Sequence, residues 1–233
     1  MRSLARPRRR ILIVLPALIA AAVVGALLAL GALGGTGEAL AGAHPADSGH
    51  TAVPARQVAL RQDMRALWEE HIIWTRMAIV DFAAGAPSLG DTEARLLRNQ
   101  ADIGDAIAPF YGRAAGRRLT GLLRSHILIA VDVLTAAKAG DTAGVARAQA
   151  RWARNADQIA GFLSGANPSA WPRAEMRRMM LEHLKLTTDE AVARLTGHWR
   201  ADIRAFDRVH LQALAMADML SAGIIGQFPR RFA

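Results

Sequence analysis

The stretch "LLRSHILIA", residues 122–130, places His126 in the middle of an apolar helical pattern. The same arrangement occurs in "LWEEHIIWT", residues 67–75, around His71, and in "MMLEHLKLT", residues 179–187, around His183. The three histidines are 55 and 57 residues apart. A unit of about 56 residues has the length of one helical hairpin, so this spacing predicts three consecutive hairpins.

Apolar residues recur at intervals of three and four beyond Pro54, which is typical of amphipathic helices. Five short stretches with helix-breaking residues divide this region into six helices: "GAPSLGD" (85–91), "PFYGRAAG" (109–116), "AGDT" (139–142), "SGANPSAWP" (164–172) and "TGHW" (196–199). Short connections require antiparallel neighbours. We therefore predict an all-α, six-helix antiparallel bundle of three helical hairpins over residues 54–229.

The N-terminus resembles a membrane signal. Residues 1–10 contain five arginines and no acid, and residues 11–34 are apolar and long enough to cross a bilayer as a transmembrane helix. The arginines predict a cytoplasmic segment 1–10, a membrane anchor 11–34 and a linker 35–53. The alternative is a cleaved signal peptide, because "AGA" (41–43) resembles a cleavage site. Both readings make the helical domain extracytoplasmic, either on the cell membrane or secreted.

The composition and the absence of certain motifs exclude several kinds of binding partner and of active site. The net charge is +9, but no basic stripe with interleaved aromatic residues is visible, so nucleic acid is not an expected partner. Cysteine is absent, which excludes disulfides, thiolate catalysis and Cys-ligated zinc. No glycine-rich phosphate loop, G-x-S-x-G or H-E-x-x-H motif occurs, so a binding role is favoured over an enzyme. The membrane, through residues 11–34, is the expected partner, and a homodimer is left open.

Polar residues lie at matched depths in the predicted hairpins. Two residues of an antiparallel hairpin lie at the same level when they are equidistant from the turn. Three pairs have midpoints (85, 140.5 and 196.5) within the breaker stretches: His71 with Asn99, His126 with Asn155, and His183 with His210. These six residues are therefore predicted to share one polar layer near the middle of the bundle.

A layer rich in histidine predicts a transition-metal site, because imidazole is a common ligand and helical bundles assemble ligands from facing helices. The expected metal ligands are His71, His126, His183, Asp207 and His210. Further cofactor-binding residues are expected to be Asn99, Asn155 and Thr187. The expected ion is copper, zinc, nickel or iron.

Two other interpretations are open. In the first, the layer holds no metal and its histidines and amides satisfy one another and set the register of a structural or interaction bundle. In the second, the domain is an enzyme, or binds haem or another small ligand, through His183, Asp207 and His210.

Six stretches carry a resemblance to known sequences: "LWEEHIIWTR" (67–76), "NQADIGDAIAPFYG" (99–112), "HILIAVDVLTAAKAGD" (126–141), "RWARNADQIAGFL" (151–163), "EHLKLTTDEAVARL" (182–195) and "ADMLSAGIIGQFP" (217–229). They resemble a family of uncharacterised bacterial helical proteins, many of which have an N-terminal membrane segment. The resemblance covers nearly all of residues 60–229. It implies a membrane-anchored helical domain and no particular reaction.

Overall fold

The computed structural model describes residues 53–233. The predicted segments 1–10 and 11–34, and all of the linker except Val53, lie outside the described residues. The described part consists of helices: α2 (Ala55–Ala84), α3 (Leu89–Tyr111), α4 (Arg113–Lys138), α5 (Thr142–Ala166), α6 (Arg173–Leu195), α7 (Trp199–Gln227) and the short 3-10 helix η1 (Pro229–Arg231). Residues 53–233 contain no strand, which confirms the all-α prediction.

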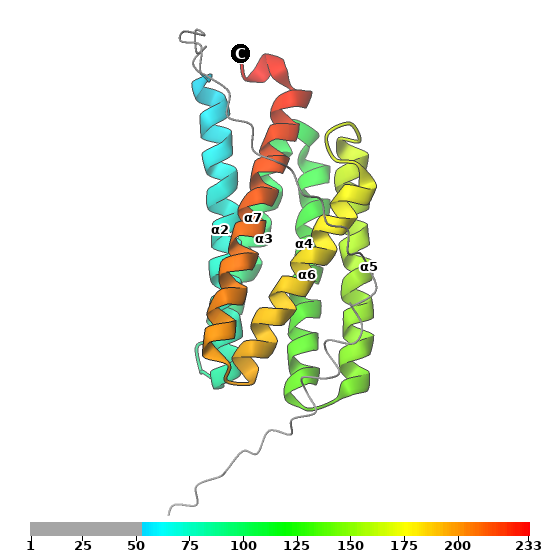
Figure 1. Ribbon diagram of the computed structural model, residues 1–233. Helices are drawn as coiled ribbons and strands as arrows, with labels where there is room; N and C mark the ends of the chain where they lie inside the picture. The colour runs from blue at the N-terminus through cyan, green and yellow to red at the C-terminus, as the bar shows by residue number, and fades with distance from the viewer. Residues whose placement is uncertain (1–52) are drawn as a thin grey trace, which may run out of the picture.

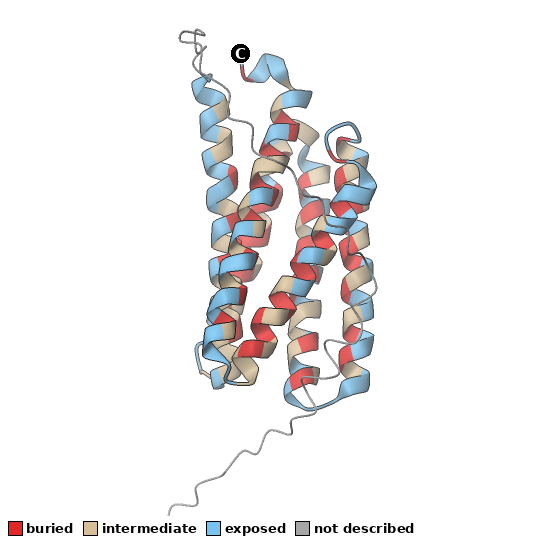
Figure 2. Cartoon of the chain, in the orientation of Figure 1, coloured by how far each residue is buried: buried red, intermediate tan, exposed pale blue. Residues whose placement is uncertain are grey.

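The six long helices form a closed bundle (Figure 1). Each helix packs against the next one in the chain, and α7 packs against α2, so that the helices form a ring. Helix α6 is tilted and also contacts α2 across the bundle (Figure 1). The buried residues form stripes along the helices, with exposed residues between them (Figure 2). Helices α2, α4 and α6 therefore alternate with α3, α5 and α7 around one interior.

Glycines with a left-handed backbone terminate helices at the tight turns. Gly85 follows α2 with a φ of 65°, Gly140 follows α4 with a φ of 72°, and Gly197 follows α6 with a φ of 75°. Glycine adopts this conformation without the steric cost that a side chain brings. Asp141 then caps the N-terminus of α5: its Oδ1 accepts a hydrogen bond from the Gly144 amide at 2.8 Å.

Helices α4 and α7 each contain a long, predominantly apolar segment. By length and composition alone, α4 and α7 could each cross a membrane, and a core helix of a soluble protein meets the same criteria. Within the bundle, both helices contribute to the core through residues such as Leu119, Leu123, Met216 and Leu220. Other large apolar side chains of the two helices, Leu128 on α4 and Ile203 and Leu211 on α7, are exposed.

Helices α3 and α4 approach each other at two glycines. A Cβ atom added to Gly116 would lie 2.6 Å from the Gly104 carbonyl oxygen, and one added to Gly104 would lie 2.7 Å from the Gly116 carbonyl oxygen. The two backbones are thus in direct contact at this crossing. This contact sets how closely α3 and α4 approach each other at this level.

Candidate histidine site

Three alternate helices each contribute one buried histidine to the middle of the bundle. His71 on α2, His126 on α4 and His183 on α6 are each 3% exposed. The ring centroid of His183 lies 5.9 Å from that of His71 and 6.0 Å from that of His126. The structure therefore brings together three of the five predicted metal ligands, with the ring of His183 close to both of the others.

A side-chain amide holds the ring of His126 in place. Nδ1 of His126 lies 2.9 Å from Oδ1 of Asn155, and Nδ2 of Asn155 donates to the Leu122 carbonyl at 3.0 Å. Leu122 precedes the histidine by one helical turn. The amide of α5 is thus anchored to the backbone of α4 while it orients the ring.

The same arrangement recurs on α6 and α7. Nδ1 of His183 lies 2.9 Å from Oε1 of Gln212, and Nε2 of Gln212 donates to the Met179 carbonyl at 3.2 Å. Met179 again precedes the histidine by four residues. Gln212 was not predicted as a member of the layer.

On α2 and α3 this role is divided between two amides. Nε2 of Gln100 lies 3.1 Å from Nδ1 of His71, and Nδ2 of Asn99 donates to the Leu67 carbonyl at 3.0 Å. Gln100 and His71 are 29 residues apart, as are the histidine and its Nδ1 partner in the other two pairs. Asn99 therefore lies in the layer as predicted, but its neighbour Gln100 contacts the ring.

The amide partners determine which ring nitrogen carries the proton. An amide oxygen only accepts hydrogen bonds, so Nδ1 of His126 and of His183 must be protonated, and the lone pair of each neutral ring is on Nε2. At His71 the amide nitrogen of Gln100 faces Nδ1, and this nitrogen also contacts two other acceptors. Oε1 of Gln100 is buried and has no hydrogen-bond partner within residues 53–233.

Burial keeps the three rings neutral. Desolvation, together with the neighbouring rings, lowers the pKa of His71 well below 6.5 and that of His126 to about 3. Desolvation also lowers the pKa of His183, against the opposing hydrogen bond from Gln212. Neutral imidazole is the form that binds metal ions.

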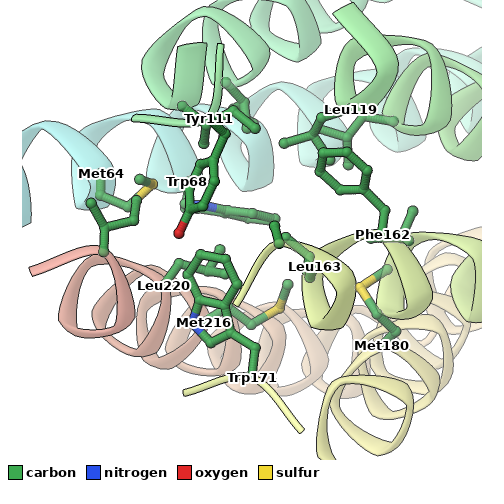
Figure 3. Close-up of a pocket in the computed structure, with 16 residues that line it drawn as sticks. Met64, Trp68, Tyr111, Leu119, Phe162, Leu163, Trp171, Met180, Met216 and Leu220 are labelled. Carbon is green, nitrogen blue, oxygen red and sulfur yellow. The ribbon is translucent and has the colours of Figure 1, made fainter. Parts of the chain in front are cut away.

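Apolar space lies on both sides of this layer. A cavity of about 20 Å³ is lined by residues that precede the histidines on α2, α4 and α6, among them Met64, Trp68 and Met180 (Figure 3). A second cavity of about 60 Å³ is lined by residues that follow them, including Ile79 and Val192. The polar layer therefore separates two apolar compartments.

Two tryptophans pack directly against the histidine rings. The ring of Trp68 meets that of His71 edge-on at a centroid distance of 5.6 Å, and the ring of Trp152 lies 5.2 Å from that of His126. Both indole Nε1 atoms are buried, and neither has a hydrogen-bond partner within residues 53–233. The immediate surroundings of the rings are thus apolar and aromatic.

The structure places the other two predicted ligands at the surface. Asp207 is exposed, and His210 stacks on Phe206 while its Nε2 lies 3.1 Å from Oε1 of Glu69. The predicted orientation of α7 was therefore wrong, because apolar and small residues occur on several faces of this helix. A constant separation of 29 residues between histidine and amide would have identified Gln212.

Thr187 is buried as expected, but its hydroxyl serves its own helix. Oγ1 of Thr187 donates to the His183 carbonyl at 2.9 Å, and Thr75 makes the equivalent bond to the His71 carbonyl at 2.7 Å. Within residues 53–233, neither hydroxyl bonds a ring nitrogen. In the described region, moreover, no group of three or more histidine, aspartate or glutamate side chains is arranged closely enough to hold a metal ion as it stands.

A buried ion cluster near the turn between α6 and α7 was not predicted. Arg76 on α2 bonds both Asp202 and Glu190, whose side chains are only 1% exposed, and Arg194 approaches Asp202 at 3.4 Å. Burial raises the pKa of Glu190 to about 7, against the opposing effect of Arg76. Arg76 is 114 residues from Glu190 and 126 residues from Asp202 in the sequence, so no local pattern identifies these pairs.

We expect stability to rise steeply with pH up to about pH 7. The three histidines have lowered pKa values, so below about pH 6.5 the unfolded chain binds more protons and folding is disfavoured. For His126 alone, a pKa of about 3 corresponds to a loss of roughly 5 kcal/mol at low pH. Glu190 has a raised pKa and acts in the opposite direction between about pH 4.5 and 7. Because three histidines raise the unfolding free energy as the pH rises and only Glu190 lowers it, we expect a net increase. Urea unfolding of wild type and His126→Gln at pH 4.5–7.5 checks this: the variant's slope should be shallower by about 1.4 kcal/mol per pH unit, and an unchanged slope would contradict a neutral, buried His126.

No protein-family model, curated protein or solved structure matches the chain.

Proposed function

We propose that the helical domain is a binding module in which Nε2 atoms of His71, His126 and His183 hold one transition-metal ion. The observation that carries the proposal is the fixed orientation of the rings: Nδ1 of His126 and His183 is bonded to an amide oxygen that is itself anchored to the backbone. Histidine ligands of metals are usually held in this way, through the ring nitrogen that does not bind the ion.

The chemistry of the layer is consistent with copper, zinc, nickel or iron, all of which bind imidazole. Because the pKa values of the rings are lowered, no proton has to be displaced from them at neutral pH. Asp207 and His210 are left out of this proposal because they lie at the surface. Asn99, Asn155 and Gln212 take the supporting role.

Metal binding requires two adjustments. Ligand nitrogens about 2.0–2.1 Å from one ion bring ring centroids to roughly 5–5.5 Å from one another, so the observed 5.9 and 6.0 Å must shorten. His71 must also carry its proton on Nδ1, which requires Oε1 of Gln100, now without a partner, to turn toward the ring. The turn of Gln100 gives up the bonds that its Nε2 donates to the Leu96 carbonyl and to Oδ1 of Asn99, so metal binding must compensate for their loss.

Elemental analysis of the full chain, purified in detergent without a histidine tag, tests this function. We expect close to one equivalent of metal after reconstitution, and its loss in His126→Gln and His183→Gln, because each removes a ligand. His198→Gln and His210→Gln are the matched controls and should retain the metal, since both residues lie outside the layer. A fully reconstituted chain that binds no metal would contradict the proposal.

The runner-up function is a metal-free interaction bundle whose polar layer sets helix register. It is favoured by the anchoring of each ring to a partner 29 residues away, since buried polar pairs penalise misaligned packing. In this case Asn155→Leu alone destabilises the chain, and adding His126→Leu restores most of the loss, because no polar group is then left unsatisfied. Urea unfolding measures both variants.

We further propose that residues 11–34 anchor the domain in the cell membrane, with residues 1–10 in the cytoplasm and the three hairpin repeats outside. The apolar length of the span and the five arginines before it support this topology. Retention of the chain in membranes after alkaline carbonate washing tests the anchor. Release of a shortened chain would instead identify a cleaved signal peptide.

A further inference from the structure

We infer that the metal held by His71, His126 and His183 is monovalent copper. This inference rests on the proposed function and specifies its ligand. The geometry points to copper(I) through three features of the described residues: an uncharged ligand set, apolar surroundings and thioether sulfurs beside the layer.

The layer supplies no negative charge to a bound ion. The only buried carboxylates in residues 53–233 are Glu190 and Asp202, and both are paired with Arg76. Glu70 and Glu182, which directly precede two of the histidines, are directed elsewhere: Glu70 pairs with Arg95, and Glu182 is exposed. A divalent ion on three imidazoles would therefore leave two uncompensated charges in the core, whereas copper(I) leaves one, and desolvation cost rises steeply with charge.

The surroundings offer little replacement for a hydration shell. The cavities on both sides of the layer are lined almost wholly by apolar side chains, such as Ile103 and Leu123 on one side and Ile127 and Leu134 on the other. A three-histidine zinc site ordinarily completes its coordination with water or a substrate. Copper(I), a soft ion, can be satisfied by three imidazoles without an added anion or water.

Soft thioether groups line the smaller cavity, which lies on one side of the layer. Met64, Met180 and Met216 line the smaller cavity and are at most 3% exposed (Figure 3). Met180 precedes His183 by three residues, so the two lie on the same face of α6. Thioether sulfur prefers copper(I) to zinc. We therefore assign to Met180 the role of a supporting soft contact for the ion.

The test uses the full chain in detergent with His44, His50, His198 and His210 replaced by Gln, so that only the three histidines of the layer remain. Copper(I) is added anaerobically with a reductant as its bicinchoninate complex, and zinc(II) is added in parallel against a fluorescent chelator. We expect one equivalent of copper(I), bound more tightly than zinc(II). In Met180→Leu, the preference for copper(I) over zinc(II) should be smaller. Equal or tighter zinc(II) binding would overturn the inference and leave the metal site standing. Binding of neither ion would overturn the proposed function itself.

A variant that adds one negative charge beside the layer tests the effect of charge on metal preference. Gln212→Glu places a carboxylate on Nδ1 of His183, where it supplies the missing negative charge. The ratio of copper(I) to zinc(II) affinity should fall by about 10–100-fold, the usual scale for a change of this kind behind a metal ligand. Asn155→Asp makes the same change beside His126 and serves if the first variant fails to fold by circular dichroism. An unchanged ratio in a folded variant would overturn the charge argument.

Discussion

Replacing Arg76 by methionine is expected to lower the free energy of unfolding by about 3–5 kcal/mol, the usual cost of breaking a buried ion pair. The guanidinium donates to Oδ2 of Asp202 and to Oε1 of Glu190, both at 2.9 Å, and these carboxylates are 1% exposed. Without Arg76, Asp202 keeps only the longer contact to Arg194. Urea unfolding at pH 8, where Glu190 is largely ionised, measures the loss.

The exposed pair of Arg65 and Asp218 provides the matched control. It joins the same two helices, α2 and α7, but the side chains are 51% and 39% exposed. Arg65→Met should therefore change the unfolding free energy by at most about 1 kcal/mol. Adding Glu190→Gln to Arg76→Met should recover part of the loss, since it removes one stranded charge. Equal losses in the two arginine variants would show that burial does not determine the strength of this cluster.

Gly116→Ala is expected to destabilise the domain by about 2–3 kcal/mol. The new methyl group would lie 2.6 Å from the Gly104 carbonyl oxygen, which belongs to a backbone and cannot move aside without separating α3 from α4. The gain of about 1 kcal/mol in helix propensity offsets only part of this cost. Thermal unfolding and urea unfolding both report the change.

Gly121 lies on the same helix and is the natural comparison. A Cβ atom there meets nothing within 4 Å, so Gly121→Ala should stabilise the domain by up to about 1 kcal/mol through helix propensity alone. The two substitutions are chemically identical and are expected to have opposite signs. If Gly116→Ala were also stabilising, the close contact between α3 and α4 would be contradicted.

Much of the architecture was predictable because it depends on local pattern. The interval of three and four between apolar residues, interrupted at Gly85, Gly140 and Gly197, located the helices and their turns. The rule that residues equidistant from a turn lie at one level also predicted that Asn155 would lie level with His126, and the two side chains are hydrogen-bonded. Both inferences need only the geometry of a helix and of a hairpin.

The candidate site was predictable only in part. On α7 the pattern was read through Asp207 and His210, whereas the buried face contains Val209, Ala213 and Gln212 near this level. Alanine, methionine and leucine are distributed over several faces of this helix, so periodicity did not identify which face is buried. The choice depended on packing against α2 and α6.

The order of residues along the chain was enough to predict the helices, their ends, and the common depth of His71, His126 and His183. Helical hydrogen bonds and turns form between residues that are close in sequence, so a local pattern predicts them. The bonds of Gln100 and Gln212 to two of the rings, and the position of His210 outside the layer, were found only in the folded arrangement of the helices. It also decided that Arg76 is paired with Glu190 and Asp202. Such partners come from different helices, and the rotation of each helix about its axis is set by the packing of the whole core.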